Sequence, residues 1–219
     1  MFHVEQSQFV EVLLEGSSIL GIKLQTNQVA ALTLYHRELQ RWNQKINLTA
    51  IRKDKDIAVK HFIDSLVCGQ ALIRRDGASL LDVGSGAGFP GLPLKILDPR
   101  LSVTLLEPNE KKTSFLRHLI GTLDLKNVMV VSKNLGDYSR DSTHRSRFTY
   151  IATRALSAAQ ILPFATALLQ PLGRMILCRT KPLTSDPGHG LTITSDIEYD
   201  LPYGFGHRVL TILEPMVSA

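Results

Sequence analysis

The spacing of apolar residues divides the chain into two parts. Up to about Arg75, apolar residues recur every three or four positions, which is the spacing of one face of an amphipathic helix. From Ser79 onward, short apolar runs alternate with helical stretches, a pattern that is typical of a doubly wound α/β sheet. The sequence therefore predicts a helical extension over residues 1–76 and an α/β domain over residues 77–219.

Three helices are predicted in the extension. The first runs from Gln6 and ends before Gly21, because glycine readily follows the last turn of a helix. Thr26 is the candidate cap of the second helix, in which apolar residues recur from Val29 to Ile46. A polar turn follows, and the third helix is expected from about Ile57.

Five strands are predicted in the α/β domain, followed by a terminal antiparallel pair. The five strands are expected at Leu80–Val83, Val103–Leu106, Val128–Val131, Tyr150–Ala152 and Met175–Cys178. A helix over Ser157–Leu169 is expected to turn at Pro171-Leu172-Gly173 into the fifth strand. The terminal pair is expected at Ile193–Tyr199 and Val209–Leu213.

Composition and charge narrow the class of protein. Contents of 44% hydrophobic and 21% charged residues are typical of a soluble globular protein, and the net charge of +5 permits a polyanionic partner without requiring one. The two cysteines, Cys68 and Cys178, form no C-x-x-C pair, so we expect no metal site and a reducing compartment. Because we recognise neither a signal peptide at Met1–Glu5 nor a membrane span, we expect a cytoplasmic protein.

A glycine-rich turn follows the first predicted strand. Asp82 precedes Gly84, Gly86 and Gly88, and such glycines bring backbone N–H groups and a helix N-terminus up to a ligand. A dinucleotide fingerprint requires a small residue at the position of Phe89. A G-x-G-x-G pattern behind an acid is instead the form of S-adenosylmethionine (SAM) methyltransferases, where a carboxylate can receive the methionine ammonium. The other interpretation is a turn without a ligand.

Glu107 ends the second predicted strand, at about the spacing of an acid that holds ribose hydroxyls. A carboxylate can accept two hydrogen bonds from a vicinal diol, and we favour this role over that of an acid supported by the dipole of the following helix. The loop Asn134–Asp137 lies where such proteins flank adenine, although its composition alone indicates only a solvated loop.

Four motifs occur in one order along the chain. They are Trp42-Asn43-x-x-Ile46-Asn47-Leu48-Thr49, Lys60-His61-x-x-Asp64-Ser65, Asp82-Val83-Gly84-x-Gly86-x-Gly88-x-Pro90-Gly91 and Thr153-Arg154-Ala155. Together they closely resemble the RsmG (GidB) family of bacterial small-subunit rRNA methyltransferases, over about residues 28–213. The resemblance implies a Rossmann-like class I methyltransferase with an N-terminal helical extension. It also implies methyl transfer from SAM to N7 of one guanine in the 530 loop of 16S rRNA.

The resemblance implies cofactor contacts at particular positions. Combined with the residues inferred from the pattern, the candidate cofactor-binding residues are Asp82, Gly84, Gly86, Gly88, Phe89, Glu107, Leu135, Gly136 and Arg154. The chain departs from the family at Gly136, where an acid is frequent and Asp137 is a possible substitute, and at Thr149, where Asp is common. It also has Cys178-Arg179-Thr180 where the family usually has Leu-Lys-Gly.

The expected chemistry needs no strong general base, because guanine N7 is already an unprotonated nucleophile. Catalysis then consists mostly of aligning the two reactants, after the target base is exposed. Arg154 is the candidate positioning residue, through the SAM carboxylate or the guanine edge; a phosphate contact or a surface charge is the alternative.

Cationic side chains are candidate RNA contacts, although a solvated face accounts equally well for any single one. The candidates are Arg37, Arg41, Lys45, Arg52, Lys53, Lys60, Arg140, Arg145, Arg147 and Arg179. Trp42 is expected in the core rather than stacked on a base. His61, Asp64 and Ser65 share one helix face, and they either pack the extension on the sheet or help to close the cofactor pocket.

The sequence therefore predicts a SAM-dependent rRNA (guanine-N7) methyltransferase. Its expected partner is 16S rRNA or the 30S subunit, with no membrane and no metal, and the chain is expected to be a monomer. One alternative is a SAM methyltransferase that acts on a different RNA, a small molecule or a protein. The other is an RNA-binding module without enzymatic activity.

Overall fold

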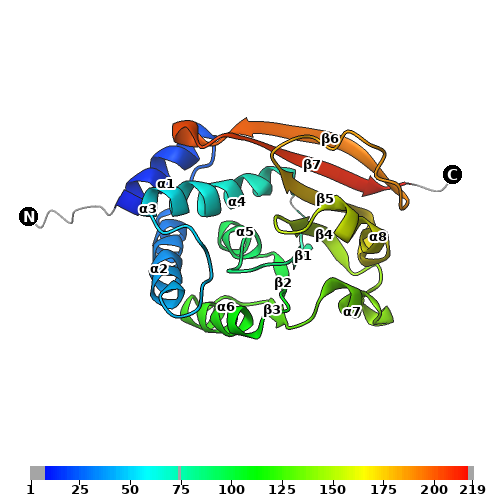
Figure 1. Cartoon of the computed structure of the whole chain (residues 1–219), viewed down its shortest axis with the longest axis horizontal. Coiled ribbons are helices and arrows are strands. Elements are labelled where there is room, and N and C mark those ends of the chain that lie inside the picture. Colours follow the sequence, from blue (N-terminus) through cyan, green and yellow to red (C-terminus); the bar gives the residue numbers. More distant parts are fainter. Residues whose placement is uncertain (1–7, 74, 217–219) are drawn as a thin grey trace, which may run out of the picture.

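The computed structural model describes residues 8–73 and 75–216 (Figure 1). The predicted start of the first helix at Gln6 and the segment Met1–Glu5 lie outside these residues. Among the helices in the described ranges, none has both the length and the hydrophobicity needed to cross a membrane.

The extension folds into helices, as the apolar spacing predicts. Its helices are α1 (Gln8–Ile19), α2 (Thr26–Asn43), α3 (Asp54–Ile57), the π-helix η1 (Ala58–Ile63), α4 (Asp64–Val67) and the 3₁₀ turn η2 (Cys68–Ala71). The last four follow one another without a break, so the third predicted helix starts at Asp54 rather than Ile57. The prediction that Thr26 caps α2 is wrong. Gln25 is the cap, since its N–H donates to Oε1 of Gln28 at 2.8 Å and Thr26 is already helical.

The sheet has seven strands in the order β3-β2-β1-β4-β5-β7-β6. The strands are β1 (Ser79–Val83), β2 (Ser102–Leu106), β3 (Val128–Val131), β4 (Phe148–Thr153), β5 (Leu169–Arg179), β6 (Leu191–Asp200) and β7 (His207–Pro215). The first five are parallel, and β7 pairs antiparallel with both β5 and β6. The predicted doubly wound sheet with a terminal antiparallel pair is confirmed.

One predicted boundary in the sheet is wrong. The expected turn at Pro171–Gly173 lies within β5, which already begins at Leu169. The pairing of β4 with β5 changes register between Phe148 and Tyr150, so an irregularity in the strand accommodates the proline and the glycine. A local reading of turn residues cannot distinguish such an irregularity from a loop.

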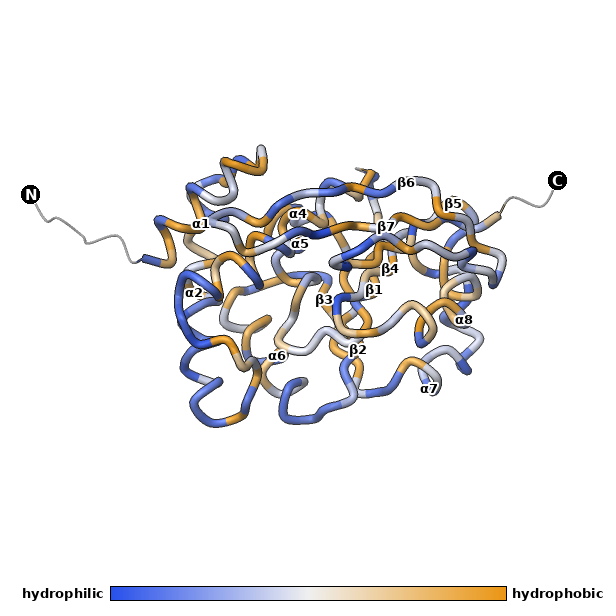
Figure 2. Tube along the Cα trace, turned by 45° about the horizontal axis from the view of Figure 1, so that its top comes forward, coloured by the Kyte–Doolittle hydropathy of each residue, from blue (hydrophilic) through white to orange (hydrophobic). Residues whose placement is uncertain are grey.

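Helices cover both faces of the sheet (Figure 1). They are α5 (Gly91–Leu97), α6 (Glu110–Thr122), α7 (Leu135–Ser139) and α8 (Ala158–Leu168), with 3₁₀ turns η3 (Ser142–His144) and η4 (Pro202–Gly204). Alternate strand residues enter two hydrophobic clusters, so Leu80 belongs to one and Leu81 to the other. The extension belongs to the cluster of Leu80, together with α5 and α6. Apolar segments accordingly run through the centre of the molecule, and hydrophilic ones lie mostly outside (Figure 2).

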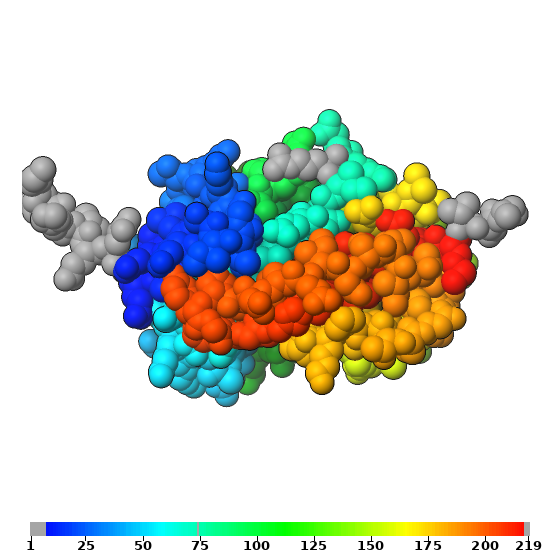
Figure 3. Space-filling view, turned by 90° about the horizontal axis from the view of Figure 1, so that it is seen from above, coloured from blue at the N-terminus to red at the C-terminus, as the bar shows by residue number. Residues whose placement is uncertain are grey.

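The C-terminal hairpin reaches the extension. Figure 3 shows the β6–β7 hairpin lying along the N-terminal helices. At the turn of this hairpin, the Tyr203 hydroxyl donates to Glu15 at 2.7 Å, and the Lys55 ammonium lies 4.3 Å from the centre of the Tyr203 ring. The turn between the two C-terminal strands therefore meets α1 and α3 of the extension.

Candidate functional site

The glycine-rich turn connects β1 to α5 at the carboxyl edge of the sheet, where open α/β sheets bind ligands. Gly84 and Gly88 have φ angles of +72° and +98°, which side chains disfavour. A Cβ at Gly88 would lie 2.7 Å from the Tyr35 hydroxyl, and one at Gly84 would lie 3.2 Å from the Cβ of Ala155. The glycines thus permit both the turn and its close packing against neighbouring segments.

Asp82 supports this turn from inside the protein. Its carboxyl group is fully buried, and Oδ2 accepts a hydrogen bond of 2.8 Å from the Gly91 N–H at the start of α5. Oδ1 has no hydrogen-bond partner among the described residues. Burial raises the pKa of Asp82 to about 7. Its contact with a methionine ammonium stays a prediction, and its observed role is to fix α5 to β1.

Glu107 faces the glycine turn from the end of β2. Its Oε2 accepts from the Gly86 N–H at 2.8 Å, and its Oε1 accepts from the Asn109 N–H at 3.0 Å. The fold therefore brings together the acid and the glycine turn that the sequence singled out. A carboxylate has about four acceptor positions, so two remain for a diol. Ribose binding by Glu107 remains a prediction that this geometry permits.

A cavity of about 410 Å³ lies beside the turn. Its lining residues are mostly apolar: Val83, Gly84, Leu106, Pro108, Lys133, Asn134, Leu135, Gly136, Leu156, Ala159, Gln160 and Phe164. We call it the apolar cavity. Its lining includes the predicted cofactor-binding residues Gly84, Leu135 and Gly136. Its apolar walls suit a flat aromatic ring. Asp137 does not line it, because its carboxylate is held by Asn134 at 2.7 Å and Arg140 at 2.6 Å.

The side chain of Phe89 belongs to the core. It stacks on Tyr35 at 5.2 Å and on His61 at 4.9 Å between ring centres, so the glycine turn is packed directly against the extension. A cofactor contact from Phe89 stays a prediction. His61 itself is neutral, because burial and the neighbouring cations Arg154 and Lys60 lower its pKa to about 3. Its Nε2 hydrogen-bonds the Thr49 hydroxyl at 2.8 Å.

Arg154 joins the end of β4 to the extension. Its Nη2 lies 2.6 Å from the carbonyl oxygen of Lys60 and 2.8 Å from Oδ2 of Asp64, and Nη1 donates to the Ser65 hydroxyl at 2.8 Å. The π-helix η1 supplies the Lys60 carbonyl, and such helices are frequent at functional sites. Tyr199 of β6 completes the network by donating to Oδ1 of Asp64 at 2.7 Å. Arg154 is therefore an anchor between elements, and its role toward a ligand stays a prediction.

The second motif thus forms a packing network, one of its two expected roles. Asp64 and Ser65 face Arg154, while His61 packs between Thr49 and Phe89. A role in closing a cofactor pocket stays a prediction for all three residues.

A second cavity, of about 540 Å³, adjoins the first. Its lining residues include four cations and one acid: Asp64, Arg154, Leu156, Ser157, Cys178, Arg179, Thr180, Lys181 and Arg208. We call it the basic cavity. Leu156 lines both cavities and lies between them. The cations suit an anionic ligand. Arg154 and Arg179 were predicted from the sequence, whereas Leu156, Lys181 and Arg208 were not, because no local pattern marks them.

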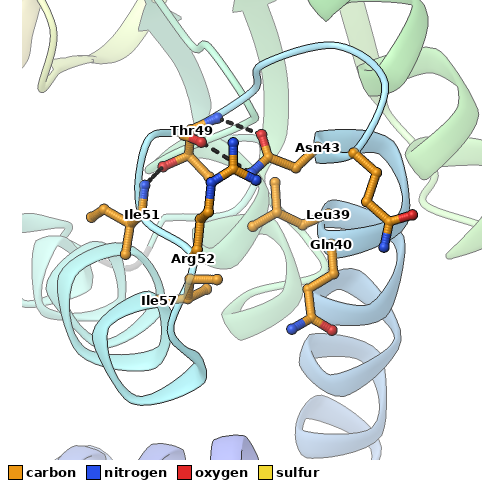
Figure 4. Close-up of a pocket in the computed structure, with 8 residues that line it drawn as sticks. Leu39, Gln40, Asn43, Thr49, Ile51, Arg52 and Ile57 are labelled. Atoms are coloured by element: carbon orange, nitrogen blue, oxygen red, sulfur yellow. Dashed lines mark hydrogen bonds between the residues drawn. The ribbon is translucent and has the colours of Figure 1, made fainter.

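The predicted RNA contacts on the extension are spread over its surface. Arg37, Arg41, Lys45 and Arg52 are exposed, and Lys60 is partly buried beside Asp56. Arg52 lines a smaller cavity of about 230 Å³, shown in Figure 4, where Asn43 and Thr49 bind each other through two hydrogen bonds of 3.0 Å. Trp42 packs against Phe115 and His118, with ring centres 5.7 and 5.1 Å away, as expected for a core residue.

Thr149, one of the departures from the family, lies away from both cavities. It stands near the amino end of β4, where its hydroxyl accepts from the Ser79 N–H at 3.2 Å. The cavities lie at the opposite, carboxyl edge of the sheet. Thr149 therefore lines neither cavity, whereas Gly136 lines the apolar cavity and Arg179 lines the basic cavity.

Comparison with known proteins gives consistent results. The family model "GidB: rRNA small subunit methyltransferase G" matches residues 28–186. The protein named Ribosomal RNA small subunit methyltransferase G from Roseiflexus sp. (strain RS-1) is 41% identical over 169 residues, which cover 76% of this chain and 71% of that protein. The protein of the same name from Alkaliphilus oremlandii (strain OhILAs) is 34% identical over 212 residues, or 92% of this chain and 89% of that protein.

Solved structures share the fold. A SAM-dependent methyltransferase from Aquifex aeolicus has a TM-score of 0.53 at 14% identity, with 72% of this chain and 92% of that chain covered. TrmN from Thermus thermophilus has a TM-score of 0.55 at 19% identity, with 73% of this chain covered, and the match spans about half (53%) of the TrmN chain. The sheet is thus that of class I SAM-dependent methyltransferases.

Proposed function

The chain belongs to the GidB family of rRNA small subunit methyltransferase G proteins, and we propose that it methylates N7 of a guanine in the 530 loop of 16S rRNA with SAM as the methyl donor. The observation that carries this proposal is the pair of adjoining cavities. One is apolar and bordered by the glycine turn, the other is basic, and they meet at Leu156.

The residues of the apolar cavity fit SAM. Leu106, Leu135 and Gly136 would enclose the adenine, and Glu107 would accept hydrogen bonds from the ribose hydroxyls. The methionine part of SAM would lie over the glycine turn at Gly86, where the missing side chain leaves open space. When bound, SAM supplies a methyl group on a sulfonium, which an uncharged nucleophile can attack.

The basic cavity would receive the target guanine and its phosphate. Arg179, Lys181 and Arg208 provide N–H donors for phosphate oxygens or the guanine O6. Because N7 carries no proton, this chain's residues need only hold the base with N7 toward Leu156 and the apolar cavity. The rate enhancement then comes from alignment of the two reactants. The base must leave its stack in the RNA to enter such a cavity.

Arg154 would act as a positioning residue. It lines the basic cavity and holds the extension through Asp64, Ser65 and Lys60, so its position fixes the wall on which the guanine rests. In this proposal, residues 1–76 are an RNA-facing extension, with Arg37, Arg41, Lys45 and Arg52 on its exposed surface, and residues 77–219 are the SAM-binding domain. We further propose that the protein acts as a monomer in the cytoplasm, on 16S rRNA or the 30S subunit.

The test is methyl transfer from labelled SAM to 30S subunits or 16S rRNA that lack the modification. The product is mapped by a reaction that cleaves RNA at 7-methylguanine. Cleavage at one guanine of the 530 loop supports the proposal, and RNA that already carries the methyl group is the control. Label in another RNA, a protein or a small molecule would instead favour a SAM methyltransferase of different specificity. SAM binding by calorimetry distinguishes both outcomes from an RNA-binding module without enzymatic activity.

A further inference from the structure

Two thiols from distant parts of the chain touch each other beside the basic cavity. Cys68 lies in η2 of the extension, and Cys178 lies near the end of β5. Their Sγ atoms are 3.3 Å apart, within reach of a hydrogen bond between the thiols, although 110 positions separate them in the sequence. They are the chain's two cysteines, and their sequence spacing alone gave no sign of this contact.

The two thiols differ in access. Cys178 is partly exposed and lines the basic cavity, whereas Cys68 is completely buried behind it. The hydrogen bond to Cys178, together with burial, raises the pKa of the Cys68 thiol well above its usual value. A reagent that enters the basic cavity therefore meets Cys178 first, with the protonated thiol of Cys68 directly behind it.

We propose that Cys68 and Cys178 form an oxidisable dithiol site whose oxidant is a hydroperoxide entering through the basic cavity. The Cys178 thiolate attacks a peroxide oxygen, so that an S–O bond forms, the O–O bond breaks and hydroxide leaves, which takes up a proton. The Cys68 sulfur then attacks the Cys178 sulfur, forming the S–S bond and breaking the S–O bond, and its proton leaves in the departing water. The two thiols lose two electrons, and hydrogen peroxide becomes two water molecules.

The disulfide would change the wall of the basic cavity. Its sulfur atoms must come within about 2.05 Å of each other, so they have to approach by more than an ångström, through rotation of the two side chains or movement of η2 against β5. Cys178 is adjacent to Arg179 in that wall, and the Cys68 thiol lies 3.5 Å from the carbonyl oxygen of Asp64, whose carboxylate binds Arg154. The apolar cavity has neither cysteine in its lining. Oxidation is therefore expected to disturb the acceptor side of the site and to spare the cofactor side.

The test of the site itself is chemical. Reduced full-length protein is treated with hydrogen peroxide, remaining thiols are alkylated, and peptides are identified by mass spectrometry. We expect an intramolecular Cys68–Cys178 bridge that dithiothreitol reverses. In Cys178→Ser, Cys68 should stay reduced, and in Cys68→Ser, Cys178 should accumulate as a sulfenic acid. The proposal would be overturned if both wild-type thiols stay unreacted under conditions that oxidise an unfolded cysteine peptide. It would also be overturned if Cys68 is oxidised as fast in Cys178→Ser as in the wild-type protein.

The effect on methyl transfer rests on the function proposed above. Oxidised wild-type protein is expected to lose roughly 10- to 100-fold in turnover of RNA, the scale of an ångström-sized misplacement of reactants, with its SAM affinity unchanged. Each variant is compared with itself before and after peroxide. Unchanged turnover of a fully bridged protein would refute the effect on the acceptor site. If reduced protein methylates no RNA, the proposed function fails, and peptide mapping still decides whether the dithiol site exists.

Discussion

Among the three glycines Gly84, Gly86 and Gly88 of the turn, Gly86 is the one where an added side chain would meet open space. Its φ is +58°, and a Cβ built there would approach nothing closer than the Gly84 carbonyl at 3.9 Å. A valine at this position would therefore project toward the space proposed for SAM and would be strained in a conformation that β-branched residues avoid.

We predict that Gly86→Val abolishes SAM binding measured by calorimetry and lowers the free energy of unfolding by about 1–3 kcal/mol. Gly121→Val is the matched control, because Gly121 lies in α6 with nothing within 4 Å of an added Cβ. The control should bind SAM normally. Undiminished affinity in Gly86→Val would show that the cofactor does not lie over this turn.

The buried carboxyl group of Asp82 should make the stability of the protein depend on pH. Burial raises its pKa in the folded protein to about 7, from an ordinary value of 3.8, so the folded state holds this proton more tightly than the unfolded state does. The stability that the protonated carboxyl contributes is present below pH 4 and is lost as the pH rises to about 7. Asp82→Asn does not titrate.

The free energy of unfolding of wild type, relative to that of Asp82→Asn, should therefore fall between pH 4 and pH 8. The fall should be at most about 4–5 kcal/mol, because each pKa unit corresponds to about 1.4 kcal/mol. Urea denaturation of both proteins across this range measures the difference. Because both proteins contain the same other carboxyl groups, the pH dependence that those groups contribute cancels in the difference. A constant difference, or one with the opposite slope, would mean that Asp82 is charged throughout.

The case of Asp82 also shows what the sequence could reveal of single residues. The spacing of Asp82, Gly84 and Glu107 identified the turn and the acid opposite it, because both follow strand ends that the apolar pattern marks. It could not reveal that Asp82 is enclosed while Glu107 faces the turn. Burial depends on the packing of α5 over β1, which no local pattern contains.

At the scale of elements, Arg154 links the end of β4 to η1 through the Lys60 carbonyl, and to β6 through Asp64 of α4. Alanine at position 154 would leave the buried Asp64 carboxylate without its closest cation, which lies 2.8 Å away. Breaking a buried ion pair from one side typically costs about 3–5 kcal/mol.

We predict that Arg154→Ala lowers both the free energy of unfolding, by about 3–5 kcal/mol, and the turnover of RNA. The double variant Arg154→Ala/Asp64→Asn should recover part of the stability, because the buried side chain at position 64 then carries no charge. Chemical denaturation of the four proteins of this cycle measures the coupling. If the two single changes add up to the loss measured in the double variant, the coupling energy is zero and the pair contributes nothing to the junction between extension and sheet.

Elements were more predictable than their details. The strands and helices follow from periodicity, and all seven strands lie at or near their expected positions. The π-helical turn η1 was not expected. Its Lys60 carbonyl accepts from Arg154 and its Phe62 packs on Phe89, and no local pattern of apolar residues contains these long-range contacts. The junction that holds the site together was therefore the part least visible in the sequence.

At the scale of the whole molecule, the two cavities arise only when β1, β4, β5 and β7 meet at one edge of the sheet. Leu156 and Arg208 line them from segments far apart in the chain. The proposed acceptor site is therefore tested best by reversing a charge at the basic cavity. The control is the same reversal at the opposite, amino edge of the sheet. Lys181 is exposed at the basic cavity, whereas Lys126 is exposed in the loop before β3, at the amino edge.

We predict that Lys181→Glu weakens RNA binding and slows methylation, whereas Lys126→Glu, with the same change in net charge, alters neither. A lysine that contacts one phosphate contributes about 0.7–0.9 to the slope of log affinity against log salt concentration, so this slope should become shallower by about that amount in Lys181→Glu alone. SAM affinity should be unchanged in both variants, because neither lysine lines the apolar cavity. If both reversals weaken RNA binding equally, only the overall charge of the protein attracts RNA, and the basic cavity is not its acceptor site.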